Sequence, residues 1–270
     1  MESGPGSSGC GVSQGSVTWT EMGCNDAREI GRLAGHVAVV TGASSGIGRA
    51  IAIALSREQA HLCAVGRNPV ALAETVATAR QFSEARAFQI DLTVEESLQP
   101  LIQFLDELGH VEILIHGAGV IHQGRAEQAD VTDFDRQYAA NVRAPYVLTQ
   151  RLLPLLTAAP GQIVFINSSA GLTAKRPEVG QYAATKHALR AIADSLREEV
   201  NPKGIRVLSV YLGRTATPMQ EALFHQEGKT YHPAVLLQPE DVASIVVGAL
   251  ILPYTAEVTD ISIRPMRRPG

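Results

Sequence analysis

A chain of 270 residues, of which 45% are hydrophobic and 19% charged, can bury one large core, and this favours a single globular domain. The formal net charge of −4 gives no basic surface to attract nucleic acid or an anionic membrane, and no apolar run is long enough to span a bilayer. The three cysteines, Cys10, Cys24 and Cys63, have no ligand-like spacing, so no metal site or disulfide framework is expected, and a cytoplasmic location is the simplest interpretation.

The N-terminal stretch MESGPGSSGCGVSQGS is rich in glycine and serine and lacks the apolar segment of a secretory signal. We therefore predict a disordered extension over residues 1–32, because such a composition buries too little apolar surface to become ordered. A start codon placed too far upstream is an alternative of similar weight. Residues 33–265 are predicted to form the folded domain, and residues 266–270 a short tail.

From Leu33 onward, short β-branched runs alternate with longer helical patterns. Asn68 before Pro69 is typical of a helix start, and Thr93 with Glu96 forms a potential capping box. Strands are expected at 36–41, 60–66, 84–90, 111–117, 161–169, 204–212 and 257–265. Helices are expected at 47–58, 69–80, 93–109, roughly 127–159 with interruptions at Pro145 and Pro154, 181–200, and from Pro239 onward. The alternation predicts an α/β fold with a doubly wound parallel sheet of about seven strands and helices on both faces.

The stretch TGASSGIG, residues 41–48, lies between the first expected strand and the first expected helix. Its three glycines permit positive φ angles and a close approach of the backbone to a ligand. The N–H groups and the dipole of the helix N-terminus suit a pyrophosphate. A plain tight turn is the structural alternative.

This stretch resembles the cofactor loop of the short-chain dehydrogenase/reductase superfamily, and further motifs of that family follow in order over about residues 33–265. Two departures stand out: His116 and Gly117 replace two asparagines, and Leu212 replaces a proline. The other similar segments are HGAG at 116–119, Asn141, SSAG at 168–171, YAATK at 182–186 and LGRTATPM at 212–219. The resemblance implies a Rossmann-like fold and hydride transfer between a nicotinamide cofactor and a carbonyl or secondary alcohol of a small or medium substrate.

Tyr182 and Lys186 are four residues apart and would share one face of a helix. An ammonium group near a phenol favours the phenolate and lowers its pKa, so Tyr182 is the expected proton donor and acceptor. A packed tyrosine beside a solvated lysine is the alternative. Ser169 lies thirteen residues before Tyr182, the interval of the family, and is expected to hold the substrate oxygen; Ser168 is expected only to cap the strand end.

The resemblance implies that Asn141 shapes its helix and supports a water-linked proton path to Lys186, with an ordinary helix asparagine as the alternative. His116 is expected to be neutral and hydrogen-bonded rather than catalytic. The full set expected to bind the cofactor is Gly42, Ser44, Ser45, Gly46, Ile47, Gly48, Arg67, Asp91, Leu92, Gly117, Ala118, Gly119, Tyr182, Lys186, Gly213, Thr215 and Thr217.

NAD-preferring proteins place an acidic residue at the end of the second expected strand, and here that position is Gly66, followed by Arg67. A guanidinium there can pair with a 2′-phosphate, which favours NADP(H), although NAD(H) stays possible. Ser45 occupies a position where NADP-preferring relatives often carry a second basic residue. Asp91 resembles the family residue that contacts adenine, and a local cap ahead of Thr93 is its alternative role.

Residues 212–237 are expected to form a substrate lid, with Met219, Leu223, Phe224 and Tyr231 as its apolar part; a mobile surface loop is an equal alternative. The helices at 127–159 and 181–200 carry apolar residues on more than one face, and relatives pair such helices, so a homodimer or homotetramer is expected. A catalytically silent NADP(H) sensor or scaffold is the alternative function, which the departures at 116, 117 and 212 motivate.

Overall fold

A seven-stranded parallel sheet forms the centre of the computed structural model, which describes Met1 and residues 31–267. The order β3-β2-β1-β4-β5-β6-β7, with every neighbouring pair parallel, confirms the doubly wound α/β fold. The strands are β1 (Val37–Thr41), β2 (His61–Gly66), β3 (Ala85–Gln89), β4 (Ile113–His116), β5 (Gln162–Ser168), β6 (Arg206–Leu212) and β7 (Asp260–Ile263). The expected extension over 1–32 and tail over 266–270 lie largely outside the described residues.

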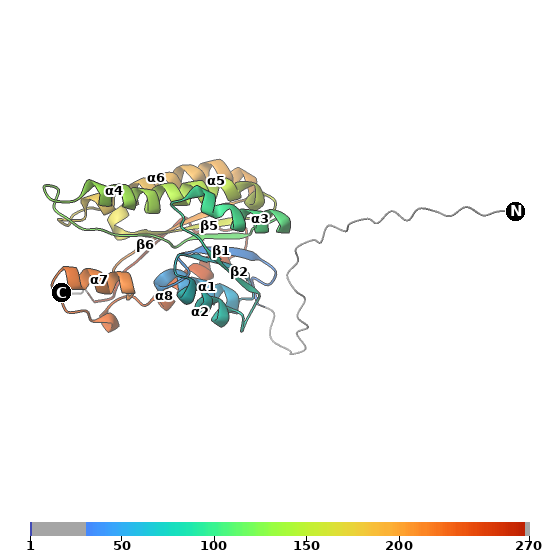
Figure 1. Cartoon of the computed structure of the whole chain (residues 1–270), viewed down its shortest axis with the longest axis horizontal. Helices are drawn as coiled ribbons and strands as arrows, with labels where there is room; N and C mark the ends of the chain where they lie inside the picture. The colour runs from blue at the N-terminus through green and yellow to red at the C-terminus, as the bar shows by residue number, and fades with distance from the viewer. Residues whose placement is uncertain (2–30, 268–270) are drawn as a thin grey trace.

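Helices cover both faces of the sheet, as expected. Helices α3, α4, α5 and α6 lie on one face and α1, α2 and α8 on the other (Figure 1). Their bounds are α1 (Gly46–Arg57), α2 (Pro69–Ala79), α3 (Gln99–Leu108), α4 (Val131–Tyr138), α5 (Ala144–Thr157), α6 (Gly180–Val200), α7 (Pro218–Gln226) and α8 (Pro239–Leu250). Because successive side chains of a strand point to opposite faces, Val37 and Val39 join the core under α3, α5 and α6, whereas Ala38 and Val40 join the core under α1, α2 and α8.

The strand order reverses at β1, which pairs with β2 on one side and β4 on the other. The connections that follow β1 and β4 therefore diverge to opposite faces, and the carboxyl ends of these two strands border a crevice. The glycine loop at 42–48 follows β1, and residues 117–119 follow β4. Both expected cofactor segments consequently lie at the position where open α/β sheets bind ligands.

Two local expectations about helix starts have different outcomes. The Asn68 cap is confirmed, because its Oδ1 accepts a hydrogen bond from the Ala71 N–H at 3.1 Å. The capping box at Thr93 and Glu96 is wrong. The Thr93 hydroxyl and N–H both donate to the Asp91 carboxylate, at 2.7 and 3.0 Å, and a 3₁₀ turn from Glu95 to Leu98 leads into α3.

The long helical region contains no break at either proline. Helix α4 starts after Asp130, whose side chain accepts from the Thr132 N–H, and runs through a π-helical turn, Ala139–Arg143, into α5. Pro145 lies in the first turn of α5 and Pro154 within it. The π turn before Pro145 shifts the hydrogen-bond register, so a residue without an N–H can follow.

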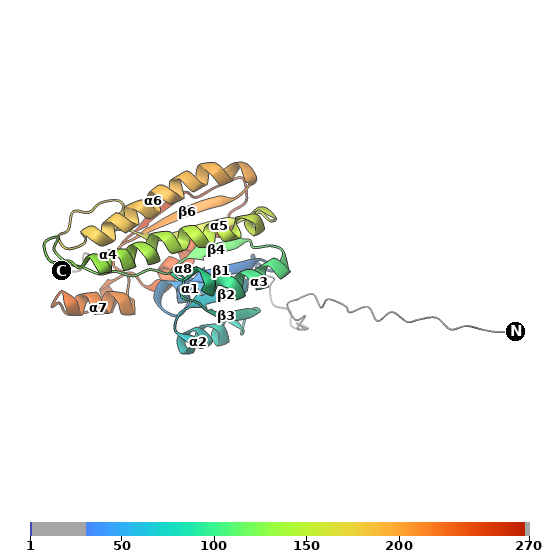
Figure 2. The same cartoon turned by 45° about the horizontal axis from the view of Figure 1, so that its top comes forward.

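Residues 212–237 contain helix α7 and a 3₁₀ turn at Pro233–Val235, so much of this segment is regular structure rather than loop. Figure 2 shows α7 at the end of the molecule where α4 begins, while α4 and α5 run alongside α6. Within residues 31–267, no helix combines the length and apolar character that a membrane crossing requires.

Candidate active site

The glycine loop after β1 takes a conformation that needs its glycines. Gly42 and Gly46 have positive φ angles of 70° and 53°. The first helical hydrogen bond of α1 joins the Arg49 N–H to the Ser45 carbonyl at 3.2 Å, so the three preceding N–H groups lie outside the helical ladder. A Cβ on Gly48 would lie 2.3 Å from the Gly42 carbonyl oxygen, which excludes any other residue from this close packing.

Next to this loop lies a hydroxyl that lacks a hydrogen-bond partner. Ser44 Oγ is buried and unpaired among the described residues. Gly66, at the end of β2, leaves room for it: a Cβ on Gly66 would lie 2.1 Å from Ser44 Oγ. Free N–H groups at a helix start beside an unpaired hydroxyl fit the phosphate oxygens of a dinucleotide. The residues present therefore fit the expected cofactor.

A cavity of about 340 Å³ extends from the glycine loop across the ends of β2, β3 and β4. Arg67 is exposed at its rim, and the Asp91 carboxylate faces the same space. The hydrogen bonds from Thr93, with a smaller contribution from the Arg67 charge, hold the pKa of Asp91 below its ordinary value. The cavity is lined by Gly42, Ser44, Ser45, Gly46, Ile47, Gly48, Gly66, Arg67, Asn68, Ile90, Asp91, Leu92, Thr93, Gly117, Ala118, Gly119, Val120, Ala140, Thr217, Pro218 and Met219.

Thr41 braces the segment after β4, a role that the sequence analysis did not assign. Its hydroxyl accepts hydrogen bonds from the N–H groups of Gly117 and Ala118, at 3.1 and 3.2 Å, and donates to the Ile115 carbonyl. His116 lies behind this segment, where its Nε2 contacts Thr149 Oγ1 at 2.8 Å. Burial lowers the pKa of His116 to about 3, so the ring is neutral, as expected.

Helix α6 presents Tyr182 and Lys186 to a second cavity of about 320 Å³, which shares residues 117–120 with the first. Lys186 is 5% exposed, and its Nζ donates to the Ile166 carbonyl at 3.1 Å and lies 5.8 Å from the centre of the Tyr182 ring. Burial lowers the pKa of Lys186 to about 8. Burial also raises the pKa of Tyr182, against an opposing hydrogen bond with Ser168. The expected downward shift at Tyr182 is therefore not seen in this structure.

Ser168, rather than the expected Ser169, contacts the Tyr182 hydroxyl. Strand β5 ends at Ser168, and the chain then turns through a 3₁₀ turn, Ser169–Gly171, which leaves Ser169 exposed. Ser168 Oγ accepts a hydrogen bond from the Ala170 N–H at 3.1 Å. The choice of Ser169 is corrected to Ser168 on this geometry, because the interval of thirteen residues does not account for the conformation of the connecting turn.

Asn141 lies in the π turn and joins two walls of the site. Its Oδ1 accepts from the Val120 N–H at 2.8 Å, and its Nδ2 donates to the Val120 carbonyl and to Thr185 Oγ1. Pro145 has no N–H, so it cannot donate to the Asn141 carbonyl four residues earlier, where a regular helix would have its bond. Asn141 thus fixes the segment after β4 against α6, one residue from Lys186.

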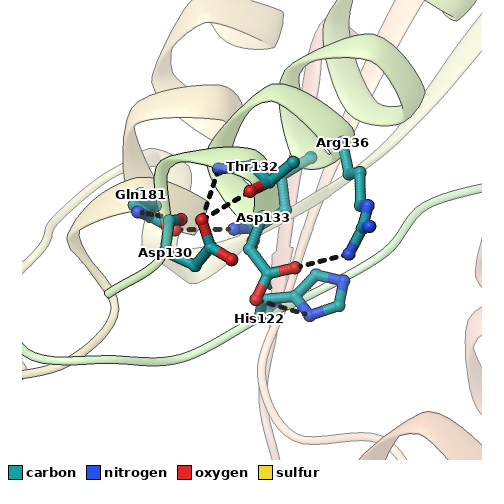
Figure 3. A network of polar contacts seen from close by, with 7 residues as sticks. His122, Asp130, Thr132, Asp133, Arg136 and Gln181 are labelled. Carbon is teal, nitrogen blue, oxygen red and sulfur yellow. Dashed lines mark hydrogen bonds and ion pairs between the residues drawn. The ribbon is translucent and has the colours of Figure 1, made fainter. Parts of the chain in front are cut away.

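The connection between β4 and α4 forms one wall of the second cavity, and a polar network holds it (Figure 3). His122 Nδ1 lies 3.5 Å from Asp133 Oδ2, and Asp133 Oδ1 accepts a hydrogen bond from Arg136 Nη1. Gln181 Nε2 donates to the Asp130 carbonyl, which ties the network to the start of α6. The wall and the helix that carries Tyr182 are therefore one connected unit.

The remaining expected residues lie after β6. The Gly213 N–H donates to the Ile263 carbonyl at 2.8 Å, and Thr215 Oγ1 donates to the Gly213 carbonyl. Thr217 caps α7 by accepting from the Gln220 N–H. Gly213 and Thr215 line the second cavity, and Thr217 lines both. Of the expected lid residues, Met219 and Leu223 line the second cavity, whereas Phe224 and Tyr231 pack their rings together at 5.6 Å.

The burial of Lys186 predicts a cost in stability. Replacing it as Lys186→Met should raise the free energy of unfolding at about pH 7 by up to about 3 kcal/mol, because folding depresses this ammonium pKa from 10.5 to about 8. In the wild type, the loss of unfolding free energy caused by the buried ammonium is complete below pH 8, where Lys186 is charged in both states. The loss disappears as the pH rises through 10.5, where Lys186 becomes neutral in both states. Urea unfolding at about pH 7 and about pH 10 measures it. A methionine variant that gains nothing at the lower pH would contradict the assignment of a strained buried ammonium.

Comparison with known proteins agrees with this architecture. An uncharacterized oxidoreductase of Staphylococcus epidermidis is 34% identical over 233 residues, which cover 85% of this chain and 97% of the relative. An alcohol dehydrogenase from Thermococcus sibiricus, solved with 5-hydroxy-NADP, superimposes with a TM-score of 0.76 at 26% identity, covering 87% and 99% of the two chains. A short-chain dehydrogenase from Burkholderia cenocepacia, solved with NADP, gives 0.75 at 27% identity, covering 86% and 97%.

The family profile described as short chain dehydrogenase matches residues 36–228, a range that includes the glycine loop, the segment after β4 and the start of α6. These three segments together are those expected of an oxidoreductase that depends on a nicotinamide nucleotide. The chain also has the sheet order of the family, its glycine loop, and Tyr182 and Lys186 on α6. This chain therefore belongs to the short-chain dehydrogenase/reductase family.

Proposed function

We propose that the chain transfers hydride between NADP(H) and the carbonyl or secondary alcohol of a small or medium organic substrate. The observation that carries this proposal is the convergence of Tyr182, Ser168 and Lys186 on a cavity that continues into the glycine-lined cavity. Hydroxyl and ammonium groups at that junction suit a reaction in which charge develops on a substrate oxygen.

A nicotinamide cofactor, when bound, would supply or accept the hydride. During reduction, Tyr182 donates its proton to the carbonyl oxygen. Ser168 would orient that oxygen, because it lines the same cavity and its hydroxyl contacts the Tyr182 hydroxyl. Lys186, beside Tyr182, would hold the nicotinamide ribose, while Gly42, Ser44 and residues 45–48 would hold the phosphates.

Proton resupply to Tyr182 is proposed to run through Lys186 and Asn141. A lysine with a pKa of about 8 gives up and regains a proton readily near neutral pH. Because Pro145 has no N–H, the Asn141 carbonyl lacks the usual helical donor four residues later. We propose that this carbonyl holds a water molecule beside Lys186. This path rests on the resemblance to the family as well as on the geometry.

The experiment compares two adjacent serines. Ser168→Ala should lower kcat for NADPH-dependent carbonyl reduction by about 10²-fold or more, since it removes a donor to the developing oxyanion. Ser169→Ala should change kcat far less, because this side chain lines the same cavity but is exposed, whereas Ser168 contacts the Tyr182 hydroxyl. NADPH absorbance, followed over a broad panel of carbonyl compounds, provides the measurement. Equal losses in both variants, or a loss only in the Ser169 variant, would overturn the role given to Ser168.

Arg67 is proposed to set the preference for NADP(H). The guanidinium is exposed at the cavity rim and has no ion pair with any residue in 31–267, so it is available to a 2′-phosphate. Arg67→Ala should weaken NADPH binding by about 10- to 100-fold and leave NADH binding nearly unchanged. Titration of cofactor fluorescence measures both affinities. Parallel losses for the two cofactors would contradict a 2′-phosphate contact.

A silent sensor is the less favoured function, because Tyr182 and Lys186 are both present and Ser168 contacts the phenol. NADPH binding without turnover of any compound in the panel would support it.

A homo-oligomer, paired through α4 and α5, is also proposed. Val131, Tyr138 and Tyr146 expose large apolar surfaces on these helices, at 68, 51 and 51%. Sedimentation of the purified chain tests this proposal.

A further inference from the structure

The cavity in front of Tyr182 contains more positive than negative charge. Besides Lys186, its lining includes Lys175 and Arg176, from the connection between β5 and α6, and Arg214, two residues after β6. Among residues 31–267, Glu227, just after α7, is the only acidic residue that lines it. These five residues come from four separate segments, so the fold itself brings them together.

Three cationic side chains contact the single carboxylate of Glu227. Arg214 Nη2 contacts both of its carboxylate oxygens, at 2.7 and 2.8 Å, while Arg176 Nη2 lies at 2.9 Å and Lys229 Nζ at 3.1 Å. Although burial opposes ionisation, these hydrogen bonds hold the pKa of Glu227 at about 2. One carboxylate thus faces three cations, and the cluster keeps a net positive charge.

Arg214 has an unused donor group. Its side chain is 17% exposed and its guanidinium packs over the Phe224 ring at 4.6 Å. Nη1 is buried and has no hydrogen-bond acceptor among the described residues. Lys175, in the connection between β5 and α6, lines the same cavity, is exposed and has no ion pair within the same described range. Buried N–H groups without an acceptor are rare in folded proteins, so this group calls for a partner, and the few polar groups in a ligand cavity are those that orient the ligand.

We infer that the substrate carries an anionic group, a carboxylate by geometry, which binds between Arg214 and Lys175 while its carbonyl faces Tyr182. The inference rests on the proposed function, because it names the substrate class of the same site. A planar carboxylate matches the donors of a guanidinium better than a point acceptor does. Ile121, Met219 and Leu223 line the same cavity and suit the hydrocarbon between the two polar ends.

The first test compares oxo acids with their methyl esters. Levulinate and homologous oxo acids one and two methylenes longer are each measured beside the ester, with NADPH and the full chain. The inference predicts that kcat/KM for the best acid exceeds that of its ester by at least about tenfold. Esters reduced as fast as acids, or faster, would overturn the inference and leave the proposed function standing.

Variants identify the residues responsible. Arg214→Gln should raise KM for the acid by about 10- to 100-fold, and Lys175→Gln by a smaller factor, with little effect on the ester. Arg214→Lys should recover part of the loss. Lys203→Gln is the matched control, because Lys203 is exposed after α6 and lines neither cavity. Equal effects of Arg214→Gln on acid and ester would indicate a structural role only, and would overturn the inference.

A binding measurement separates the inference from the proposed function. Hexanoate and hexanamide cannot be reduced under these conditions, so calorimetry on the NADP⁺ complex reports recognition without turnover. Hexanoate should bind and hexanamide should not, and Arg214→Gln should remove the difference. Hexanoate binding, together with no turnover of any oxo acid, ester or other carbonyl compound tested, would support the anion-binding site and reject the proposed function. Failure of hexanoate to bind any better than hexanamide would overturn the inference.

Discussion

Tyr182→Phe is expected to lower the rate of carbonyl reduction by about 10²–10⁴-fold and to leave NADPH affinity nearly unchanged. The variant loses only one hydroxyl, which is the group that contacts Ser168 and faces the shared cavity. The ring, the packing of α6 and the ammonium of Lys186 stay in place. Because only the proton transfer is removed, kcat should fall while the dissociation constant of NADPH does not.

Tyr146→Phe is the matched control for this experiment. Tyr146 lies on α5, is 51% exposed and lines neither cavity. Steady-state kinetics and a fluorescence titration of NADPH should separate the two variants. A Tyr182→Phe protein with normal turnover would reject every catalytic role proposed above, whereas a protein that no longer bound NADPH would show that the hydroxyl supports the cofactor rather than the chemistry.

Gly48→Ala is expected to abolish cofactor binding, or to prevent folding of the domain altogether. The added Cβ would lie 2.3 Å from the Gly42 carbonyl oxygen and 3.0 Å from that of Thr41, and both contacts involve backbone atoms that no side-chain rotation can relieve. The glycine loop and the start of α1 would have to separate, which would displace the N–H groups proposed to hold the phosphates.

Gly248→Ala provides the comparison, because Gly248 also lies in a helix, α8, and a Cβ there meets nothing within 4 Å. This variant should be more stable than the wild type by about 0.5–1 kcal/mol, since alanine favours helices over glycine. Thermal unfolding with and without NADPH measures both effects. If Gly48→Ala folded and bound NADPH like the wild type, the proposed close packing of the loop would be rejected.

The overall fold could be predicted because it depends on patterns that repeat along the chain. Each buried strand is a short apolar run, and the alternation with helices permits few topologies. The Thr93 capping box failed because a nearer competitor, the Asp91 carboxylate, takes both the hydroxyl and the N–H of Thr93. The break expected at Pro145 failed because a π turn accommodates the missing N–H, and the sequence does not signal such a turn directly.

The choice between Ser168 and Ser169 depended on counting backward from Tyr182, and that count assumes a connection of fixed length. Gly171 offered a better reference. A Cβ on this residue would meet Asn167 Oδ1 at 2.7 Å and the Lys186 carbonyl at 2.9 Å, so this glycine marks where the turn after β5 touches α6. Counting forward from the strand to that glycine places Ser168 at the strand end.

The bracing role of Thr41 left no local pattern in the sequence, because the residues that its hydroxyl bonds lie 74 to 77 residues away.

The first cavity draws its walls from the ends of β3, β2, β1 and β4, which are consecutive in the sheet although they come from distant parts of the chain. A dinucleotide seated there would act as a clamp across four strands at once. Edge strand β3 could not then fray, nor α1 detach, without first releasing the ligand. Occupancy should therefore slow hydrogen exchange across half of the sheet together, and the free chain should be degraded by proteases faster than the loaded one.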